Sequence, residues 1–219
     1  MMTNKNIVIL AAGSFPTHAV PLGLLLDADF VVCCDSAYRS YYDFSPGQDT
    51  PFVVVGDGDS LSPEWQSRLG ERFVKVEEQD YNDLHKAMVW AVSHFDVASS
   101  TFTILGAMGR REDHAIGNIS YLADFVAGFH TDDIAIVDDY GRWTAFTGSR
   151  SFVSFPRQQV SIFTLTPHLP ISASGLQYPL DNAVLSRWWN ATLISAVADS
   201  FSLRSDGWLI VFQSFEPKE

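Results

Sequence analysis

Basic side chains are scarce in this sequence: 14 Lys and Arg stand against 26 Asp and Glu, and the formal net charge is -12 at pH 7. A nucleic-acid-binding protein normally presents a basic face that neutralises phosphates, so the balance argues against such a partner. The shortage is uneven, because residues 1–141 hold 21 acidic and 8 basic side chains (net -13) whereas residues 142–219 hold 5 and 6 (net +1). This shift indicates two regions with different tasks.

Cysteines and long apolar runs are also few. Cys33 and Cys34 are the two cysteines, and they are adjacent in an expected strand, where successive side chains point to opposite faces. They predict neither a structural disulfide nor a zinc site. The apolar run at residues 7–12 is too short to span a membrane, and the opening residues lack the pattern of a secretory signal. We therefore expect a cytoplasmic protein with no membrane partner.

Apolar residues, in contrast, make up 47% of the 219 residues, enough for a sizeable core. The first region alternates strand-length apolar runs with helical spacings, which predicts an α/β domain with a mainly parallel sheet. Ser62-Pro63-Glu64 has the pattern of a helix start. One helical stripe comprises Leu84, Met88, Ala91, Val92 and Phe95, and another comprises Ile116, Ile119, Leu122, Ala123 and Val126. The expected strands are residues 7–11, 30–34, 52–55, 73–76, 102–105 and 134–137.

After about Gly141 the pattern changes to short strands separated by turns. We predict an all-β, sandwich-like domain over residues 142–219, following an α/β domain over residues 1–141. Ser205-Asp206-Gly207 is a strong hairpin signal. The expected strands here are residues 143–146, 151–155, 160–165, 193–197, 201–204 and 208–212.

Polar residues follow the expected parallel strands, where ligands bind in such sheets. Asp57 and Asp59 lie two apart on a glycine-flanked turn and could share a cation, for which Mg²⁺ is the natural candidate. The alternative is an ordinary solvated turn. Asp83 and Lys86 lie three residues apart at a helix start near Asn82. They are either a metal-binding carboxylate beside a phosphate-binding ammonium or an ordinary surface ion pair.

A glycine loop, Gly106-x-x-Gly109-Arg110-Arg111, precedes another expected helix. Its backbone N–H groups and arginines suit phosphate oxygens, although a plain strand-to-helix turn has the same glycines. Neither a P-loop nor a Gly-x-Gly-x-x-Gly motif occurs in the sequence. His114 is either a general base or an ordinary solvated histidine. Taken together, the three elements indicate a Mg-nucleotide phosphate site.

These motifs, in this order, resemble the thiamin pyrophosphokinase family. The resemblance is carried by Asp57-Gly58-Asp59-Ser60, by Gln79 to Asp83 with Lys86, and by Gly106-x-x-Gly109-x-Arg111-x-Asp113-His114 with Asn118. Ser174 to Leu180 is similar to the C-terminal motif of the family. The resemblance implies transfer of pyrophosphate from ATP to the hydroxyl of thiamin, giving thiamin diphosphate and AMP. It also implies a homodimer with thiamin sites between subunits.

The resemblance further implies a role for each matching residue. Mg²⁺ would be held by Asp57, Asp59 and Asp83, and Asp80 would accept a proton from the hydroxyl or orient it. ATP would be bound by Lys86 and Arg111 with Gly106 and Gly109, and Asp113 would orient the arginine loop. Thiamin would face Asp35, Gln79 and Tyr178.

Three positions depart from the family pattern: Ser36-Ala37 replaces Gly-Gly, Arg110 replaces a glycine, and Val197-Ala198 replaces a Ser-Asn pair. The last departure keeps open a non-catalytic thiamin or nucleotide binder on the same scaffold. Trp188 and Trp189 could supply a replacement surface for a cationic ring, or they belong to the sandwich core or a dimer contact. A haloacid dehalogenase-type phosphatase is disfavoured, because Ala11-Ala12-Gly13-Ser14 stands where an Asp-x-Asp nucleophile is needed.

Overall fold

The computed structural model describes residues 4–44 and 49–218. The contacts between Cα atoms divide the chain into two compact units. The first comprises the described residues of Met1–Tyr121 with Ile136–Asp139, and the second comprises those of Leu122–Ala135 with Tyr140–Glu219. The boundary predicted between residues 141 and 142 remains a prediction.

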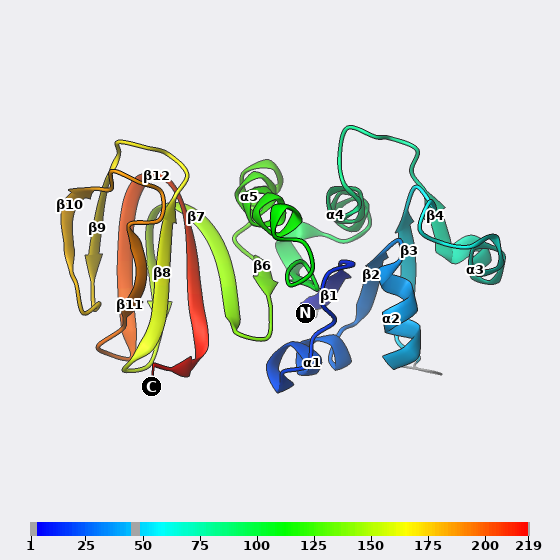
Figure 1. Ribbon diagram of the computed structural model, residues 1–219, viewed down its shortest axis with the longest axis horizontal. Coiled ribbons are helices and arrows are strands. Elements are labelled where there is room, and N and C mark those ends of the chain that lie inside the picture. Colours follow the sequence, from blue (N-terminus) through cyan, green and yellow to red (C-terminus); the bar gives the residue numbers. More distant parts are fainter. Residues whose placement is uncertain (1–3, 45–48, 219) are drawn as a thin grey trace. The chain divides into compact units, whose positions relative to one another are not determined.

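The first unit is built on parallel strands, as the alternating pattern predicted (Figure 1). The strand order is β5-β1-β2-β3-β4, and β6 (Ile134–Val137) neighbours β5. Ile7 to Leu10 of the central strand are at most 1% exposed, which explains their unbroken apolar run. The strands are β1 (Lys5–Leu10), β2 (Phe30–Cys34), β3 (Phe52–Gly56), β4 (Phe73–Lys75) and β5 (Ser100–Leu105).

Helices connect these strands, and α4 and α1 lie on opposite sides of the strands in the view of Figure 1. The predicted start at Ser62 is confirmed, since its hydroxyl accepts a hydrogen bond from the Trp65 N–H. The helices are α1 (Ala19–Leu26), α2 (Ala37–Phe44), α3 (Pro63–Leu69), α4 (Asp83–His94) and α5 (Glu112–Phe129), with 3₁₀ turns η1 (Gly70–Arg72) and η2 (Val97–Ser99).

The predicted stripe on α5 is wrong at its first position. Ile116 is 58% exposed, whereas Ala115, Asn118, Leu122 and Phe125 are buried. The buried face is therefore rotated by about one residue at the start of the helix, where it includes a polar side chain that holds the neighbouring loop.

The second unit contains antiparallel strands (Figure 1). Its order is β10-β9-β12-β7, and β8 pairs with both β12 and β11. Apolar side chains alternate toward one core, in which the Phe152 and Phe201 rings stack 4.8 Å apart. This confirms an all-β, sandwich-like second region. The strands are β7 (Gly141–Val153), β8 (Gln158–Thr164), β9 (Pro170–Ser174), β10 (Leu180–Val184), β11 (Ala191–Ser195) and β12 (Ser200–Pro217).

The predicted hairpin at Ser205-Asp206-Gly207 is wrong, because β12 runs through it without reversing. Residues 206–208 form a bulge: Ser205 still pairs with Gly148 of β7, and pairing resumes at Leu209 with Phe146. The Trp208 N–H donates to the Thr166 hydroxyl at 3.1 Å instead of closing a turn. Long-range pairing with β7 thus overrides the local turn preference, and β9 and β10 are strands that the sequence pattern did not predict.

Candidate active site

A cavity of about 360 Å³ lies in the first unit, beside the loops that follow its strands. This is the edge of a parallel sheet at which ligands bind. The predicted residues Asp83 and Arg111 line the cavity. The remaining lining residues are Ala11, Ala12, Gly13, Cys34, Ser36, Ser60, Asn82, Leu84, Ala107, Met108, Arg110, His114 and Asn118.

The aspartate turn after β3 is held by its own backbone. The Asp59 N–H donates to the Asp57 carboxylate at 3.0 Å, and Gly58 has φ +86°, which favours glycine. The Gln66 side chain of α3 donates to the carbonyls of Gly58 and Leu61, each at 2.9 Å. The turn is therefore fixed with the Asp57 carboxylate directed toward the next element of the site.

That element is Lys86 of α4, whose side chain is only 3% exposed. Its Nζ lies 3.5 Å from Asp57 Oδ2 and 3.4 Å from Asp83 Oδ1. The helix begins with Asn82 as its cap, because the Asn82 carboxamide accepts from the His85 N–H at 3.0 Å. The pair predicted from sequence is thus a buried cation between two carboxylates rather than a surface ion pair.

The carboxylates perturb one another's ionisation. Burial raises the pKa of Asp83, and repulsion from Asp57 and Asp59 adds to this rise, while Lys86 opposes it. The pKa of Asp57 is lowered, first by the Asp59 N–H and then by Lys86 and the Gln79 side chain. The three aspartates and Gln79 are therefore close enough to interact, as their sequence positions predicted.

Asp35, which follows β2, is buried in the same region. One carboxylate oxygen accepts from the Ser60 N–H at 3.0 Å, and the other has no hydrogen-bond partner among the described residues. Burial raises its pKa, with further repulsion from Asp83 and Asp57. Asp35 is 2% exposed and is not among the residues that line the cavity, so its unpartnered oxygen is enclosed by protein.

The glycine loop after β5 packs tightly against the loop after β1. Gly13 N–H donates to the Gly106 carbonyl and Ser14 N–H to the Met108 carbonyl, both at 2.7 Å. Gly106 (φ +66°) and Gly109 (φ +88°) adopt the left-handed conformation that favours glycine. A Cβ at Gly106 would lie 2.5 Å from the Ala11 carbonyl oxygen. Glycine here therefore permits a close approach of two backbones.

The arginines extend from this loop toward different partners. Arg110 donates to the Ala12 carbonyl at 3.2 Å. Arg111 forms two hydrogen bonds with the Asp113 carboxylate, at 3.1 and 2.6 Å, in the side-by-side geometry that arginine favours. This pair lowers the pKa of Asp113 to about 2. Asp113 thus pairs with Arg111 beside the cavity, and its role in orienting the arginine loop stays a prediction.

Two asparagines connect the helices to the loop. Asn118 of α5 donates to the Ala107 carbonyl at 2.7 Å and accepts from the Asn82 side chain at 3.1 Å. The start of α4, the start of α5 and the glycine loop therefore share one hydrogen-bond chain. This chain keeps the carboxylate–lysine cluster in register with the arginine loop.

Other predicted residues are less closely engaged. Asp80 is exposed, and its main-chain N–H donates to the Glu78 carboxylate. His114 is exposed at the rim of the cavity. Tyr178 belongs to the second unit and is 62% exposed. The roles that the resemblance assigns to Asp80 and Tyr178 stay predictions.

The second unit also holds one of the three positions that depart from the family pattern, Val197-Ala198. Val197 is 56% exposed, and its N–H donates to the Gly175 carbonyl at 3.0 Å. Trp188 and Trp189 are 56% and 40% exposed, so neither ring is buried in the sandwich core. Trp188 rests on Phe163, with the ring centroids 5.4 Å apart.

Sequence reasoning missed the loop after β1 as a wall of the cavity. Ala11-Ala12-Gly13 lines it, and the small side chains are the signal that could have found it, because they admit the neighbouring backbone. Ser36 and Ser60 were missed as lining residues too. A serine after a strand has too many ordinary explanations to be singled out without the fold.

A magnesium ion fits part of this cluster. Among residues 4–44 and 49–218, no three carboxylate, imidazole or thiol groups form a ready-made metal site. Mg²⁺ needs only one or two protein carboxylates, because water and substrate phosphate complete its shell. Asp57 and Asp83 converge on one ammonium, and the pKa of Asp83 is raised first by burial and then by repulsion from Asp57 and Asp59, both of which a bound cation would oppose.

Comparison with known proteins gives the same family over both regions. The sequence profile described as "Thiamin pyrophosphokinase, catalytic domain" matches residues 23–136, and "Thiamin pyrophosphokinase, substrate-binding domain" matches residues 141–212. Thiamine pyrophosphokinase 3 of Oryza sativa subsp. japonica is 33% identical over 110 residues, which cover 42% of this chain and 41% of that protein. Thiamin pyrophosphokinase 1 of Caenorhabditis elegans is 28% identical over 102 residues, covering 45% and 42%. The matches thus span about two fifths of these curated relatives.

Solved structures agree in fold. A thiamin pyrophosphokinase family protein from Enterococcus faecalis superposes with a TM-score of 0.77 at 22% identity, covering 96% of this chain and 99% of that one. Thiamine pyrophosphokinase from Bacillus subtilis gives 0.76 at 21% identity, covering 95% and 98%. Together with the profile matches along both regions, these similarities lead to one conclusion: the chain belongs to the thiamin pyrophosphokinase family.

Proposed function

We propose that the protein is a Mg²⁺-dependent thiamin pyrophosphokinase, which transfers the pyrophosphoryl group of ATP to the hydroxyl of thiamin and releases thiamin diphosphate and AMP. The observation that carries this proposal is the buried Lys86 between Asp57 and Asp83, next to a cavity that Arg110 and Arg111 also line. Cations and carboxylates in this arrangement suit a metal-bound polyphosphate better than an uncharged ligand.

Each group has a role in positioning the polyphosphate. Asp57 and Asp83, with Asp59 beside them, would hold Mg²⁺. When bound, this ion would neutralise the charge of the phosphates. Lys86 and the Arg111 guanidinium would bind phosphate oxygens, and the main-chain N–H groups near Gly106 and Gly109 would add donors. The chain's main contribution is to hold the reactants in line, because phosphoryl transfer needs little covalent help from protein.

The acceptor hydroxyl needs orientation more than a strong base. Gln79 is exposed and interacts with Asp57, so it is suited to face thiamin, and Asp35 would contribute its buried, unpartnered carboxylate oxygen. Asp80 follows Gln79 and is the candidate to receive or orient the hydroxyl proton. Tyr178 would contribute from a second subunit of a homodimer, in line with the sites between subunits that the family resemblance implies.

Two free, buried thiols, Cys33 and Cys34, suit a reducing compartment, and we propose the cytoplasm as the location. Among the described helices, none combines the length and the apolar character that crossing a membrane requires.

Product analysis tests the activity directly. The full chain, incubated with ATP, Mg²⁺ and thiamin, should release AMP and thiamin diphosphate in equal amounts. Asp57→Asn should lower turnover by roughly 10²-fold or more, because it removes a negative charge from the cluster. Asp43→Asn is the matched control, since Asp43 is exposed at the end of α2. Release of ADP, or AMP formed equally without thiamin, contradicts the proposal.

The non-catalytic binder remains the second candidate because Val197 and Ala198 stand where the family has a polar pair. Calorimetry with thiamin and an ATP analogue separates the two functions. Tight binding of either ligand without AMP formation favours the binder. Restoring the pair by Val197→Ser with Ala198→Asn should then raise turnover if the acceptor site had been lost at these positions.

A further inference from the structure

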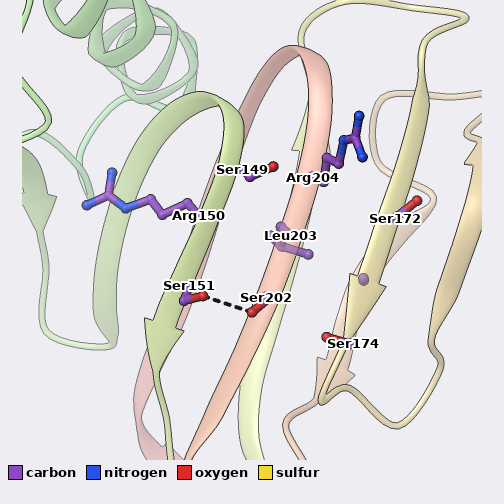
Figure 2. A pocket seen from close by; sticks show the side chains of 9 residues that line it. Ser149, Arg150, Ser151, Ser172, Ser174, Ser202, Leu203 and Arg204 are labelled. Carbon is purple, nitrogen blue, oxygen red and sulfur yellow. Dashed lines mark hydrogen bonds between the residues drawn. The ribbon is translucent and has the colours of Figure 1, made fainter.

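A second cavity, of about 380 Å³, lies in the second unit on the face of β7, β12 and β9 (Figure 2). The register places two rows of side chains across these strands: Ser151 beside Ser202 beside Ser174, and Ser149 beside Arg204 beside Ser172. The intervening residues on β12 and β9, Leu203 and Ala173, are buried in the core, and the intervening residue on β7 is Arg150. The six side chains therefore form the outer face of the sheet, which we call the serine–arginine face.

This face is unusual for strands. Residues that favour strands are β-branched or aromatic, and five of these six positions hold serine instead. Short side chains leave the floor of the cavity hollow, and each one ends in a hydroxyl that can donate or accept a hydrogen bond. Neither the fold nor the core requires serine at these positions, since they point away from the apolar interior.

Several donors of the face are uncommitted. Ser151 and Ser202 share a hydrogen bond of 2.9 Å, and Ser172 bonds to Asn182 of β10. Among the described residues, no side-chain hydrogen bond or ion pair involves Ser149, Ser174 or Arg204. The face thus presents two free hydroxyls and a free guanidinium.

Arg204 is the charge of the cavity. Arg150 directs its guanidinium away from the serines in Figure 2, and that group lies 4.0 Å from the Asp132 carboxylate. Asp206 and Asp181, the carboxylates nearest in sequence on β12 and β10, are not among the lining residues. Residues 142–219 carry a net charge of +1 against -13 for the rest of the chain. An anion therefore meets less repulsion here than elsewhere on the chain.

We propose that the serine–arginine face binds a tetrahedral oxyanion of the phosphate class, at a site separate from the nucleotide cavity of the first unit. A guanidinium offers paired donors to two oxygens of such an anion, and hydroxyls on the flanking strands reach the others. The ligand is either free phosphate or the terminal phosphate of a small ester.

Amide resonances of the ¹⁵N-labelled full chain test the proposal during titration with inorganic phosphate, because they separate this site from the nucleotide cavity. Saturable shifts are expected at the amides of the serine–arginine face. Arg204→Gln should weaken their saturation roughly tenfold or more, since it removes a charge-assisted contact. Shifts near Gly106 and Gly109 should be unchanged in that variant.

Arg187→Gln is the matched control, because Arg187 is an exposed arginine of the same unit that stacks over Trp189. It should change the phosphate affinity less than about twofold, as expected for a screened charge. Arg204→Lys should retain part of the binding. A parallel titration with AMP distinguishes the sources: saturation of the same amides at a lower concentration than with phosphate indicates a phosphate ester, and weaker or absent shifts with AMP indicate free phosphate. Absence of saturable shifts, or equal losses in Arg204→Gln and Arg187→Gln, overturns the proposal.

Discussion

In the first compact unit the candidate site residues stand on loops at the ends of strands and on the first turns of α4 and α5, whereas in the second unit polar side chains cover the middle of a sheet face. The difference follows from how the strands pair. Parallel strands such as β1 are buried along their whole length, so chemistry is confined to the edge where the loops emerge. Antiparallel strands such as β12 bury alternate residues and leave the other face to solvent.

The comparison also separates stability from activity. The core of the second unit depends on stacked aromatic rings, and the side chains of its outer face lie outside that core. In the first unit the same residues that pack, such as the buried Lys86 and Asn118, also hold the site. In the second unit, substitutions should therefore change stability and activity separately. In the first unit, a substitution that lowers stability should also lower activity.

The largest effect is expected from Phe201→Ala. Phe201 is 2% exposed and stacks on Phe152, so truncation should lower the free energy of unfolding by about 3–5 kcal/mol. Ser202→Ala, next to it on the opposite face, should cost about 1 kcal/mol or less. Urea denaturation of both variants measures the difference. Equal losses would show that the two faces of β12 are not energetically distinct.

The next largest effect is expected from Lys86→Met, which changes the candidate site of the first unit. It leaves Asp57 and Asp83 without their shared cation and removes a phosphate-binding charge, so turnover should fall roughly 10²- to 10³-fold. The AMP-release rate measures this loss. Lys75→Met is the control, because Lys75 forms an exposed pair with Glu77 and should leave turnover nearly unchanged. Similar rates in the two variants would remove Lys86 from the site.

The glycine loop gives an intermediate effect. In Gly106→Ala, a new Cβ meets the Ala11 carbonyl at 2.5 Å and the backbone has φ +66°, which should cost about 1–3 kcal/mol of stability. Gly117→Ala on α5 is a matched control with no atom within 4 Å of its Cβ, and it should stabilise by about 0.5–1 kcal/mol. Urea denaturation should show that the free energy of unfolding falls in Gly106→Ala and rises in Gly117→Ala.

How much of the fold could be predicted from the sequence depends on how far apart in the chain the interacting residues are. The parallel strands, the cap at Ser62 and the start of α4 near Asn82 follow from local spacing and local hydrogen bonds, and the sequence predicts them. The continuous β12 does not follow, because its bulge is set by pairing with β7 and by Thr166, far along the chain.

The site divides in the same way. The acidic turn, the lysine and the arginine loop are visible as motifs, but the burial of Lys86 between Asp57 and Asp83 is a tertiary contact. The serine–arginine face was not predicted at all. Its serines are distributed over three strands that are distant in sequence, and only the register of β7, β12 and β9 brings them together.

The smallest effect on stability is expected at the Arg111–Asp113 pair, and it sharpens the comparison because the pair is an exposed one at the start of α5, outside the core. The folded pKa of Asp113 is about 2, below its ordinary value of 3.8. A depressed carboxylate pKa contributes stability that is present above the unfolded value and is lost as the pH falls through the folded one. The stability difference between the wild type and Asp113→Asn should therefore be constant near pH 7 and shrink between about pH 4 and pH 2. It should also be small, because both side chains are exposed.

If Asp113 orients Arg111, the same variant should raise the KM for ATP more than it lowers kcat. A loss confined to kcat would place Asp113 elsewhere in the reaction.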